Sequence, residues 1–159
     1  MAQSLSPKTR GSVPLTLAPP SLHANSIFCF TDAAWRADQK AVGLAWIFLN
    51  QDSTEISRES SFQTAVSSPL MAEALAIRRA LLHASASGLN LIWLRSDSQG
   101  LIKAINSNLR SIELYGVLSD VDSIISSASL SVSFSFIPRD CNGVADSLTK
   151  SCLFLNLSS

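Results

Sequence analysis

Several residue types are scarce in this chain of 159 residues, and each scarcity argues against a class of protein. It has three cysteines, Cys29, Cys141 and Cys152, and none belongs to a C-x-x-C pair. An odd number without regular spacing argues against a disulfide framework, so we expect a reducing, intracellular compartment, nuclear or cytoplasmic. A zinc site built from Cys141, Cys152, His23 and His83 is also disfavoured, because their spacing matches no zinc motif.

The chain also lacks an excess of either charge and any long apolar run. Its 12 basic and 12 acidic residues cancel, so no overall field attracts nucleic acid or an acidic membrane. Phosphate binding would therefore depend on local cations and bound metal. The longest unbroken apolar run, 42–49, is too short to span a bilayer, and no membrane partner is expected. With 47% hydrophobic and 15% charged residues, the composition predicts one globular domain, a monomer by default.

The first 25 residues contain no acidic side chain and are rich in serine, proline and leucine. Lys8 and Arg10 are their only basic residues. This composition predicts a flexible tail before a domain at 26–155, followed by a short C-terminal tail at 156–159. An organellar transit peptide is the alternative for the first tail, because such segments are also Ser-rich and acid-poor, although arginine is sparse here.

Apolar periodicity and turn residues alternate from residue 27 onward and predict five strands and four helices. The expected strands are 27–31, 42–49, 54–62, 91–96 and 131–137. The expected helices are 69–87, 98–107, 113–128 and 143–153. Ser68 and Pro69 mark the start of the first helix and Gly88 its end. The polar third strand suits a sheet edge. The order β-β-β-α-β-α-α-β-α predicts an α/β fold in which helices flank a five-stranded mixed sheet.

Four acidic residues occupy places where such a sheet meets its covering helices: Asp32, Glu73, Asp97 and Asp146. Two of them follow expected strands, one lies in the first helix, and one lies near the start of the last helix. Carboxylates that converge raise one another's pKa unless cations neutralise them. Sites made only of oxygen ligands suit hard cations, so we expect Mg²⁺ or Mn²⁺.

Each acid taken alone also has a structural explanation. Glu73 would be stabilised by the dipole of a first helical turn, and Asp97 would cap the following helix. Asp146 would be a first-turn acid behind an Asn142 N-cap, and Asp32 would serve a turn. Glu73, however, borders the apolar stripe of its helix, where an uncompensated carboxylate is costly. The joint placement of all four acids favours a functional cluster.

Four short segments in a fixed order carry a family resemblance: Thr31–Trp35, Met71–Ala76, Ser96–Gln99 and Pro138–Lys150. They resemble the type 1 ribonuclease H pattern, and more narrowly the reverse-transcriptase-like ribonuclease H domains that plant genomes carry as derivatives of non-LTR retroelements. The resemblance covers about 27–152. It implies the ribonuclease H-like fold and hydrolysis of the RNA strand of RNA–DNA hybrids.

The resemblance also implies a site. Two Mg²⁺ ions, replaceable by Mn²⁺, would be held by the four acids, with Asp32 as the most plausible shared ligand. Asn142, Ser98, Gln99 and Arg139 are the candidate substrate contacts. Integrase-like nucleases are disfavoured because they lack a counterpart of Glu73, and proofreading-type exonucleases because Ala34 replaces the glutamate they need.

The chain departs from the family pattern at several points. Ala33 follows Asp32 where a glycine is common, Gly43 is the single glycine left between the first two strands, and no histidine follows His83. Two alternatives to an active nuclease therefore stay open. One is a catalytically silent nucleic-acid-binding or partner-binding remnant of a retroelement polyprotein, and the other is a plain structural α/β module.

Overall fold

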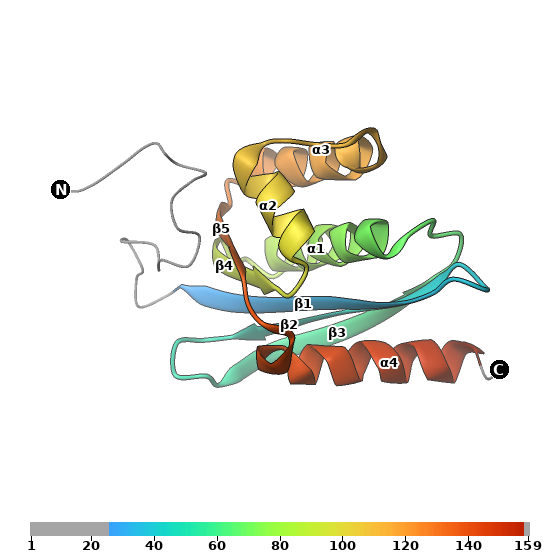
Figure 1. The fold of residues 1–159 in the computed structure, drawn as a ribbon. Helices are drawn as coiled ribbons and strands as arrows, with labels where there is room; N and C mark the ends of the chain where they lie inside the picture. The colour runs from blue at the N-terminus through green and yellow to red at the C-terminus, as the bar shows by residue number, and fades with distance from the viewer. Residues whose placement is uncertain (1–25, 158–159) are drawn as a thin grey trace.

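A five-stranded mixed sheet forms the centre of the protein, with helices on both of its faces (Figure 1). The computed structural model describes residues 26–157, so the tail expected at 1–25 lies outside the described residues. The strands are β1 (Ile27–Arg36), β2 (Ala41–Leu49), β3 (Glu55–Gln63), β4 (Leu91–Ser96) and β5 (Ser131–Phe136). The helices are α1 (Pro69–Ala86), α2 (Gln99–Ser107), α3 (Ile112–Ser127) and α4 (Gly143–Leu157), with a short 3-10 turn at Arg139–Cys141. The predicted order of elements is confirmed.

The strands lie in the order β3-β2-β1-β4-β5. β1 pairs antiparallel with β2 and parallel with β4, so the sheet is mixed as expected. β3 is an edge strand, and its mostly exposed polar side chains agree with that position. The long apolar β2 is buried along almost its whole length, because helices pack on both of its faces.

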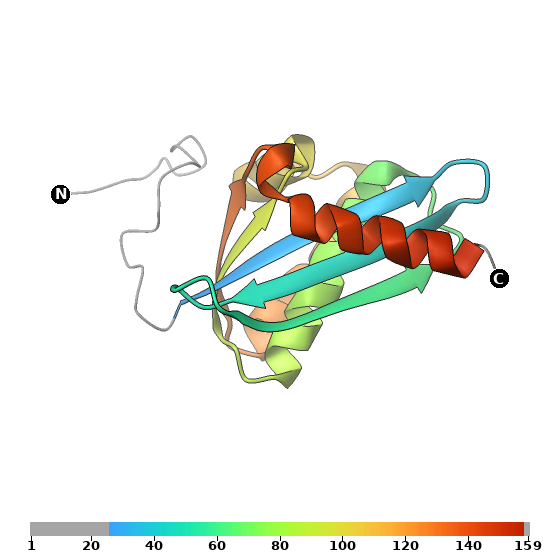
Figure 2. The same ribbon diagram turned by 90° about the horizontal axis from the view of Figure 1, so that it is seen from below.

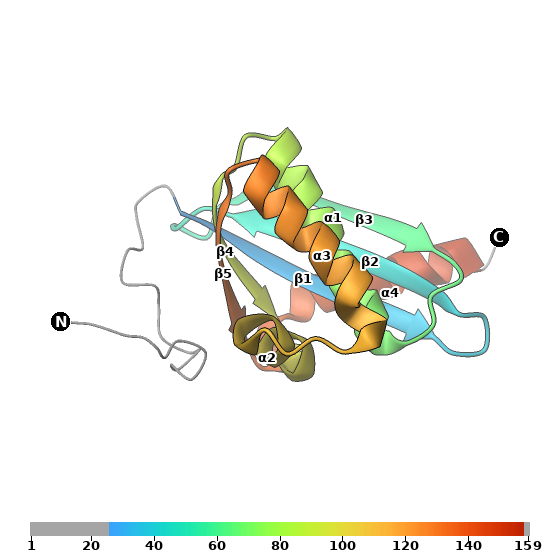
Figure 3. The ribbon, with the colours of Figure 1, turned by 90° about the horizontal axis from the view of Figure 1, so that it is seen from above.

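Helices α1 and α3 form a layer on one face of the sheet, and α4 lies alone on the other (Figures 1 and 3). α1 packs on β1 and β2, and α3 packs on α1. The core between the sheet and α1 contains large side chains such as Trp46, Phe48, Ile77 and Leu81. Ser68 caps α1 by accepting a hydrogen bond from Met71 N at 3.1 Å, and Gly88 follows the helix with φ +74°, as the sequence predicts. None of the helices within 26–157 has the length and apolarity needed to cross a membrane.

Two elements run past their expected ends. β1 continues to Arg36, because its ladder with β2 extends to the Arg36–Ala41 pair and Trp35 Nε1 donates to Val66 O at 2.8 Å. α4 continues to Leu157 rather than ending near 153, and it packs on β1, β2 and β3. Gly43 permits this packing, since a Cβ atom at Gly43 would lie 2.3 Å from Thr149 O of α4. The lone glycine of β2 therefore marks a close approach of a helix to the sheet.

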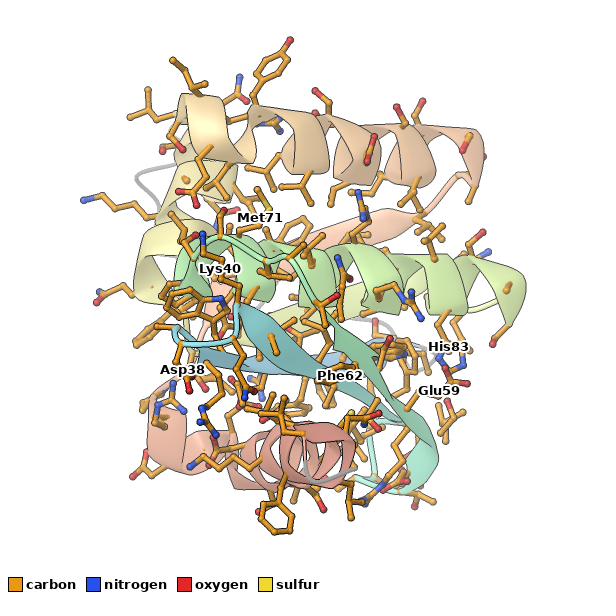
Figure 4. The ribbon with its side chains drawn as sticks, turned by 90° about the vertical axis from the view of Figure 1, so that its right-hand side faces the viewer. Asp38, Lys40, Glu59, Phe62, Met71 and His83 are labelled. Atoms are coloured by element: carbon orange, nitrogen blue, oxygen red, sulfur yellow. The ribbon has the colours of Figure 1, made fainter. Side chains whose placement is uncertain are left out.

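His83, the single histidine among the described residues, lies near the C-terminal end of α1 and faces β2 and β3. Its Nδ1 accepts a hydrogen bond from Trp46 Nε1 at 2.7 Å, and Glu59 Oε1 lies 3.9 Å away. Figure 4 shows His83 beside Glu59. Ten residues of helix, about 15 Å, separate His83 from Glu73, so His83 takes no part in the acidic cluster.

Candidate metal centre

The register of β1 and β4 places two of the four acids side by side. These parallel strands pair as far as Thr31 and Ser96, and Asp32 and Asp97 are the residues that follow directly in the two segments. The β1–β2 ladder continues past this point while the β1–β4 ladder stops, which opens a gap between β1 and β4. Both carboxylates lie at that gap. The side chain of Asp97 is 2% exposed, and Asp32 is completely buried.

Helix α1 brings the third acid to the same place. Glu73 lies in the second turn, because Pro69 is the first helical residue and the first turn contains no acid. Stabilisation by a first-turn dipole is therefore wrong as an explanation of Glu73. One carboxylate oxygen from each of Asp32, Glu73 and Asp97 lies within 4.8 Å of the others.

The oxygens of this triad have few partners within the protein. Both carboxylate oxygens of Asp32 and Oε1 of Glu73 are buried without a hydrogen bond. Buried carboxylates in this condition are costly, and native proteins compensate them with donors or cations. A hard divalent ion with oxygen ligands would supply that compensation, so the donor set fits a Mg²⁺ or Mn²⁺ ion.

The electrostatics of the triad point the same way. Burial, reinforced by the negative charge of Asp97, raises the pKa of Asp32 to about 7 from its usual 3.8. Burial and the charges of Asp32 and Asp97 raise the pKa of Glu73 well above its ordinary value. Both carboxyl groups thus resist ionisation together unless a cation is present.

Asp146 lies outside the triad and is paired with two cations. Arg139 Nη1 lies 3.2 Å from Asp146 Oδ1, and Arg139 Nη2 lies 3.3 Å from Asp97 Oδ1. Lys150 Nζ lies 3.1 Å from Asp146 Oδ2. Arg139 therefore bridges the third and fourth acids, and both oxygens of Asp146 already have a positive partner. The sequence predicts Arg139 as a substrate contact and does not predict these ion pairs.

Asn142 ties the segment before α4 to the two strands. Its Nδ2 donates to Thr31 O and to Asp97 Oδ2, each at 2.9 Å, and the residue is 2% exposed. Its Oδ1 accepts no hydrogen bond, so the side chain does not cap α4, which was the structural alternative. Asp97 also caps nothing, because Ser98 is the N-cap residue of α2. Asn142 instead holds the Asp97 carboxylate in place.

The remaining predicted substrate contacts lie beside the triad. Ser98 is half-buried and Gln99 is exposed at the start of α2, directly after Asp97. The arrangement leaves both residues within the neighbourhood of the acids. Their contact with substrate, like the metal ligation, stays a prediction.

The family model described as reverse transcriptase-like matches residues 30–152. No curated protein sequence matches the chain. LC11-RNase H1, isolated from compost by a metagenomic approach, superposes with a TM-score of 0.76 at 20% identity, over 84% of this chain and 99% of that one. Its complex with an RNA/DNA hybrid gives 0.74 at 19% identity, over 82% and 99%.

RNase H1 from the halophilic archaeon Halobacterium salinarum NRC-1 gives a TM-score of 0.74 at 21% identity, over 81% of this chain and 98% of that one. These identities establish a shared fold. The family match covers most of the chain and both strand-borne acids, the α1 glutamate and the α4 aspartate. The resemblance inferred from four short segments is confirmed: the chain belongs to the reverse-transcriptase-like family and has the ribonuclease H-like fold.

Proposed function

We propose that this protein is a metal-dependent endoribonuclease that hydrolyses the RNA strand of RNA–DNA hybrids with two divalent ions. The observation that carries the proposal is the buried triad of Asp32, Glu73 and Asp97, whose oxygens lie within 4.8 Å of one another and include three without a hydrogen bond. A buried group of carboxylates of this kind is expensive in a purely structural module. The plain structural reading is disfavoured for that reason.

The triad would hold one ion, and Asp146 together with Asp32 would hold the second. Bound divalent ions supply activation of the attacking water and stabilisation of the leaving 3′ oxygen. Asn142 keeps the Asp97 carboxylate oriented through its 2.9 Å hydrogen bond. The Arg139 side chain is 62% exposed, so its guanidinium can turn from Asp97 and Asp146 toward a substrate phosphate. Two phosphate oxygens can accept the hydrogen bonds that the two carboxylates accept in the free protein.

The nucleic-acid substrate is supported by similarity. A structure of LC11-RNase H1, which shares this fold, is a complex with an RNA/DNA hybrid. Selectivity for the RNA strand would come from contacts with 2′-hydroxyl groups across the minor groove, with little reading of bases. Ser98, Gln99 and Arg139 lie next to the acids and are the residues we expect to touch the hybrid backbone.

The test is cleavage of a labelled RNA–DNA hybrid in Mg²⁺ and in Mn²⁺ by wild type and by Asp97→Asn. We expect metal-dependent cutting of the RNA strand alone, lost in the variant. Asp120→Asn is the matched control, since Asp120 is an exposed acid on α3 that pairs with Arg78 at 2.7 Å. Folded wild-type protein that cuts no hybrid in either metal contradicts the proposal.

A silent nucleic-acid-binding remnant is the second candidate, and one observation favours it. Both oxygens of Asp146 are paired with cations of the protein itself, which would have to leave before an ion could bind there. In that case the hybrid would bind without being cut. Fluorescence anisotropy of a labelled hybrid, measured in Mg²⁺ beside the cleavage assay, separates the two candidates.

A further inference from the structure

A second cluster lies beside the metal centre, on the face of the sheet that α4 covers only in part. α4 packs chiefly against β1, β2 and β3, and within residues 26–157 no helix covers β4, β5 or the start of β1 on that side (Figure 2). Side chains alternate between the faces of a strand. Phe28 and Phe30 of β1 and Trp93 and Arg95 of β4 therefore share this face. We call these four residues the aromatic–arginine platform.

The platform is ordered by several contacts. Arg95 Cζ lies 4.5 Å from the ring centroid of Trp93, 5.2 Å from that of Phe28 and 5.7 Å from that of Phe30. The Phe28 and Trp93 rings pack with centroids 5.5 Å apart. Trp93 Nε1 donates to Ser135 Oγ at 2.6 Å, which fixes the indole on the sheet. The guanidinium thus rests on a rigid aromatic base, in which Trp93 is buried while Phe28 and Phe30 are half-buried.

Arg95 has no anionic partner among the residues that the structure describes. Arg36, Arg58, Arg78, Arg110 and Arg139 all pair with carboxylates. The Nε of Arg95 is buried without a hydrogen bond, and its neighbours are the aromatic faces and the uncharged thiol of Cys141. Cation–π contacts offset only part of the cost of desolvating a charge. An anion at this place would complete the environment of the guanidinium.

The platform is continuous with the acidic cluster and with a groove. Phe30 and Arg95 are register partners. Asp32 lies two residues beyond Phe30 on β1, about 7 Å further along the same face, and Asp97 lies two residues beyond Arg95, directly after β4 ends. Phe30 also lines a groove of about 1050 Å³ that reaches Asn142. The apolar part of that groove comes from Ile47, Leu49, Val144 and Leu148. A nucleic-acid strand bound on the platform would therefore lie two residues along β1 from Asp32.

We infer that the aromatic–arginine platform binds an unpaired nucleotide of a nucleic-acid strand, with its base stacked on the half-buried Phe28, Phe30 and Arg95 and its phosphate paired with Arg95. Aromatic rings and guanidinium planes on a sheet surface are a recurrent way to bind single-stranded nucleic acid. An apolar peptide would fit the groove but would bury the Arg95 charge without an anion. This binding goes beyond hybrid hydrolysis and does not depend on it.

The test is binding of a fluorescein-labelled oligothymidylate of about 12 nucleotides to the full chain in EDTA, where no cleavage occurs. We expect Arg95→Gln and Phe30→Leu each to weaken binding by about 5- to 100-fold. Arg95→Gln should also lower the magnitude of the slope of log K against log salt by about 0.7, because one phosphate contact is lost. Phe30→Leu should leave that slope unchanged.

Arg79→Gln is the matched control, because Arg79 also lies over a tryptophan, Trp46 at 5.8 Å, but on α1 away from the platform. It should bind like wild type. A measurement on wild type alone guards against a variant that fails to fold: the Nε1–H resonance of Trp93 should shift on addition of the oligonucleotide, and that of Trp35, bonded to Val66 O, should not. Absence of binding, or equal affinity in all three variants, would overturn the inference whatever the outcome of the hybrid cleavage assay.

Discussion

Asn142 Nδ2 lies 2.9 Å from Asp97 Oδ2, and this contact joins the start of α4 to the end of β4. The same nitrogen donates to Thr31 O on β1. One amide group therefore fixes the relative position of three segments that carry three of the four acids. The side chain is buried, so neither hydrogen bond can be replaced by water at no cost.

We expect Asn142→Ala to lower the free energy of unfolding by about 1–3 kcal/mol and to weaken Mg²⁺ binding by about tenfold or more. Urea unfolding in EDTA and calorimetric titration with Mg²⁺ measure the two effects. Asn106→Ala is the control, because Asn106 Nδ2 makes one comparable bond to Phe134 O at 3.0 Å, away from the acids. It should lower stability and leave Mg²⁺ affinity unchanged. Wild-type Mg²⁺ affinity in Asn142→Ala would show that the amide does not position Asp97.

Arg139 occupies oxygens of Asp97 and Asp146 that the proposed metal site would use. In the absence of nucleic acid, we expect Arg139→Gln to tighten Mg²⁺ binding by about two- to fivefold, a modest gain because the guanidinium is exposed. Its hybrid cleavage should fall, because a phosphate contact is lost. Titration calorimetry and the cleavage assay measure these opposite effects. Arg36→Gln, which breaks an exposed pair with Asp38 at 3.1 Å, should change neither.

The elements of the fold could be predicted from sequence because their signals are local. Ser68 and Pro69 start α1, Gly88 ends it, and the apolar run of β4 has turn residues at both ends. The ends of β1 and α4 could not be predicted, because they depend on partners distant in sequence. β1 is prolonged by its pairing with β2, and α4 by its packing along β1, β2 and β3.

The site could be predicted in part for a related reason. The identity of the acids follows from their order along the chain, and the approach of Asp32 to Asp97 follows from strand register. Glu73 joins them through the packing of α1 on β1. The bridging position of Arg139 and the double hydrogen bond of Asn142 are contacts of side chains across 42 and 111 residues, for which no local pattern exists. The platform has one signal in the sequence: Phe28 and Phe30, like Trp93 and Arg95, are two positions apart in a strand and so lie on the same face.

The stability of the metal-free protein should fall as pH rises from about 4 to about 7. The pKa of Asp32 is about 7 in the folded protein and near 3.8 when unfolded, so across this interval the folded state binds more protons. Stability is greatest below the unfolded value and is lost, by up to about 4 kcal/mol, as pH rises to the folded value. The raised pKa of Glu73 acts in the same direction.

Urea midpoints measured in EDTA across this pH interval test the effect. Asp32→Asn should flatten the profile and make the metal-free protein more stable than wild type near neutral pH, while Asp120→Asn should retain the wild-type slope. Saturating Mg²⁺ should make the wild-type protein more stable at neutral pH than it is in EDTA, because an ion that binds only the folded state stabilises it. A wild-type profile that rises with pH in EDTA would contradict the burial of an unpartnered Asp32.

Gly43 controls the docking of the helix that carries Asp146. A Cβ at this position would lie 2.3 Å from Thr149 O and 3.0 Å from Leu153 N, both backbone atoms of α4, so the helix itself must move. We expect Gly43→Ala to lower the free energy of unfolding by about 1–3 kcal/mol and to reduce hybrid cleavage, because Asn142 and Asp146 move with α4. Gly116→Ala is the control: its Cβ would meet nothing within 4 Å in α3, so it should raise stability by up to about 1 kcal/mol and leave cleavage unchanged. Full cleavage by Gly43→Ala would mean that the position of α4 does not govern the reaction, and the fourth carboxylate would then have no part in it.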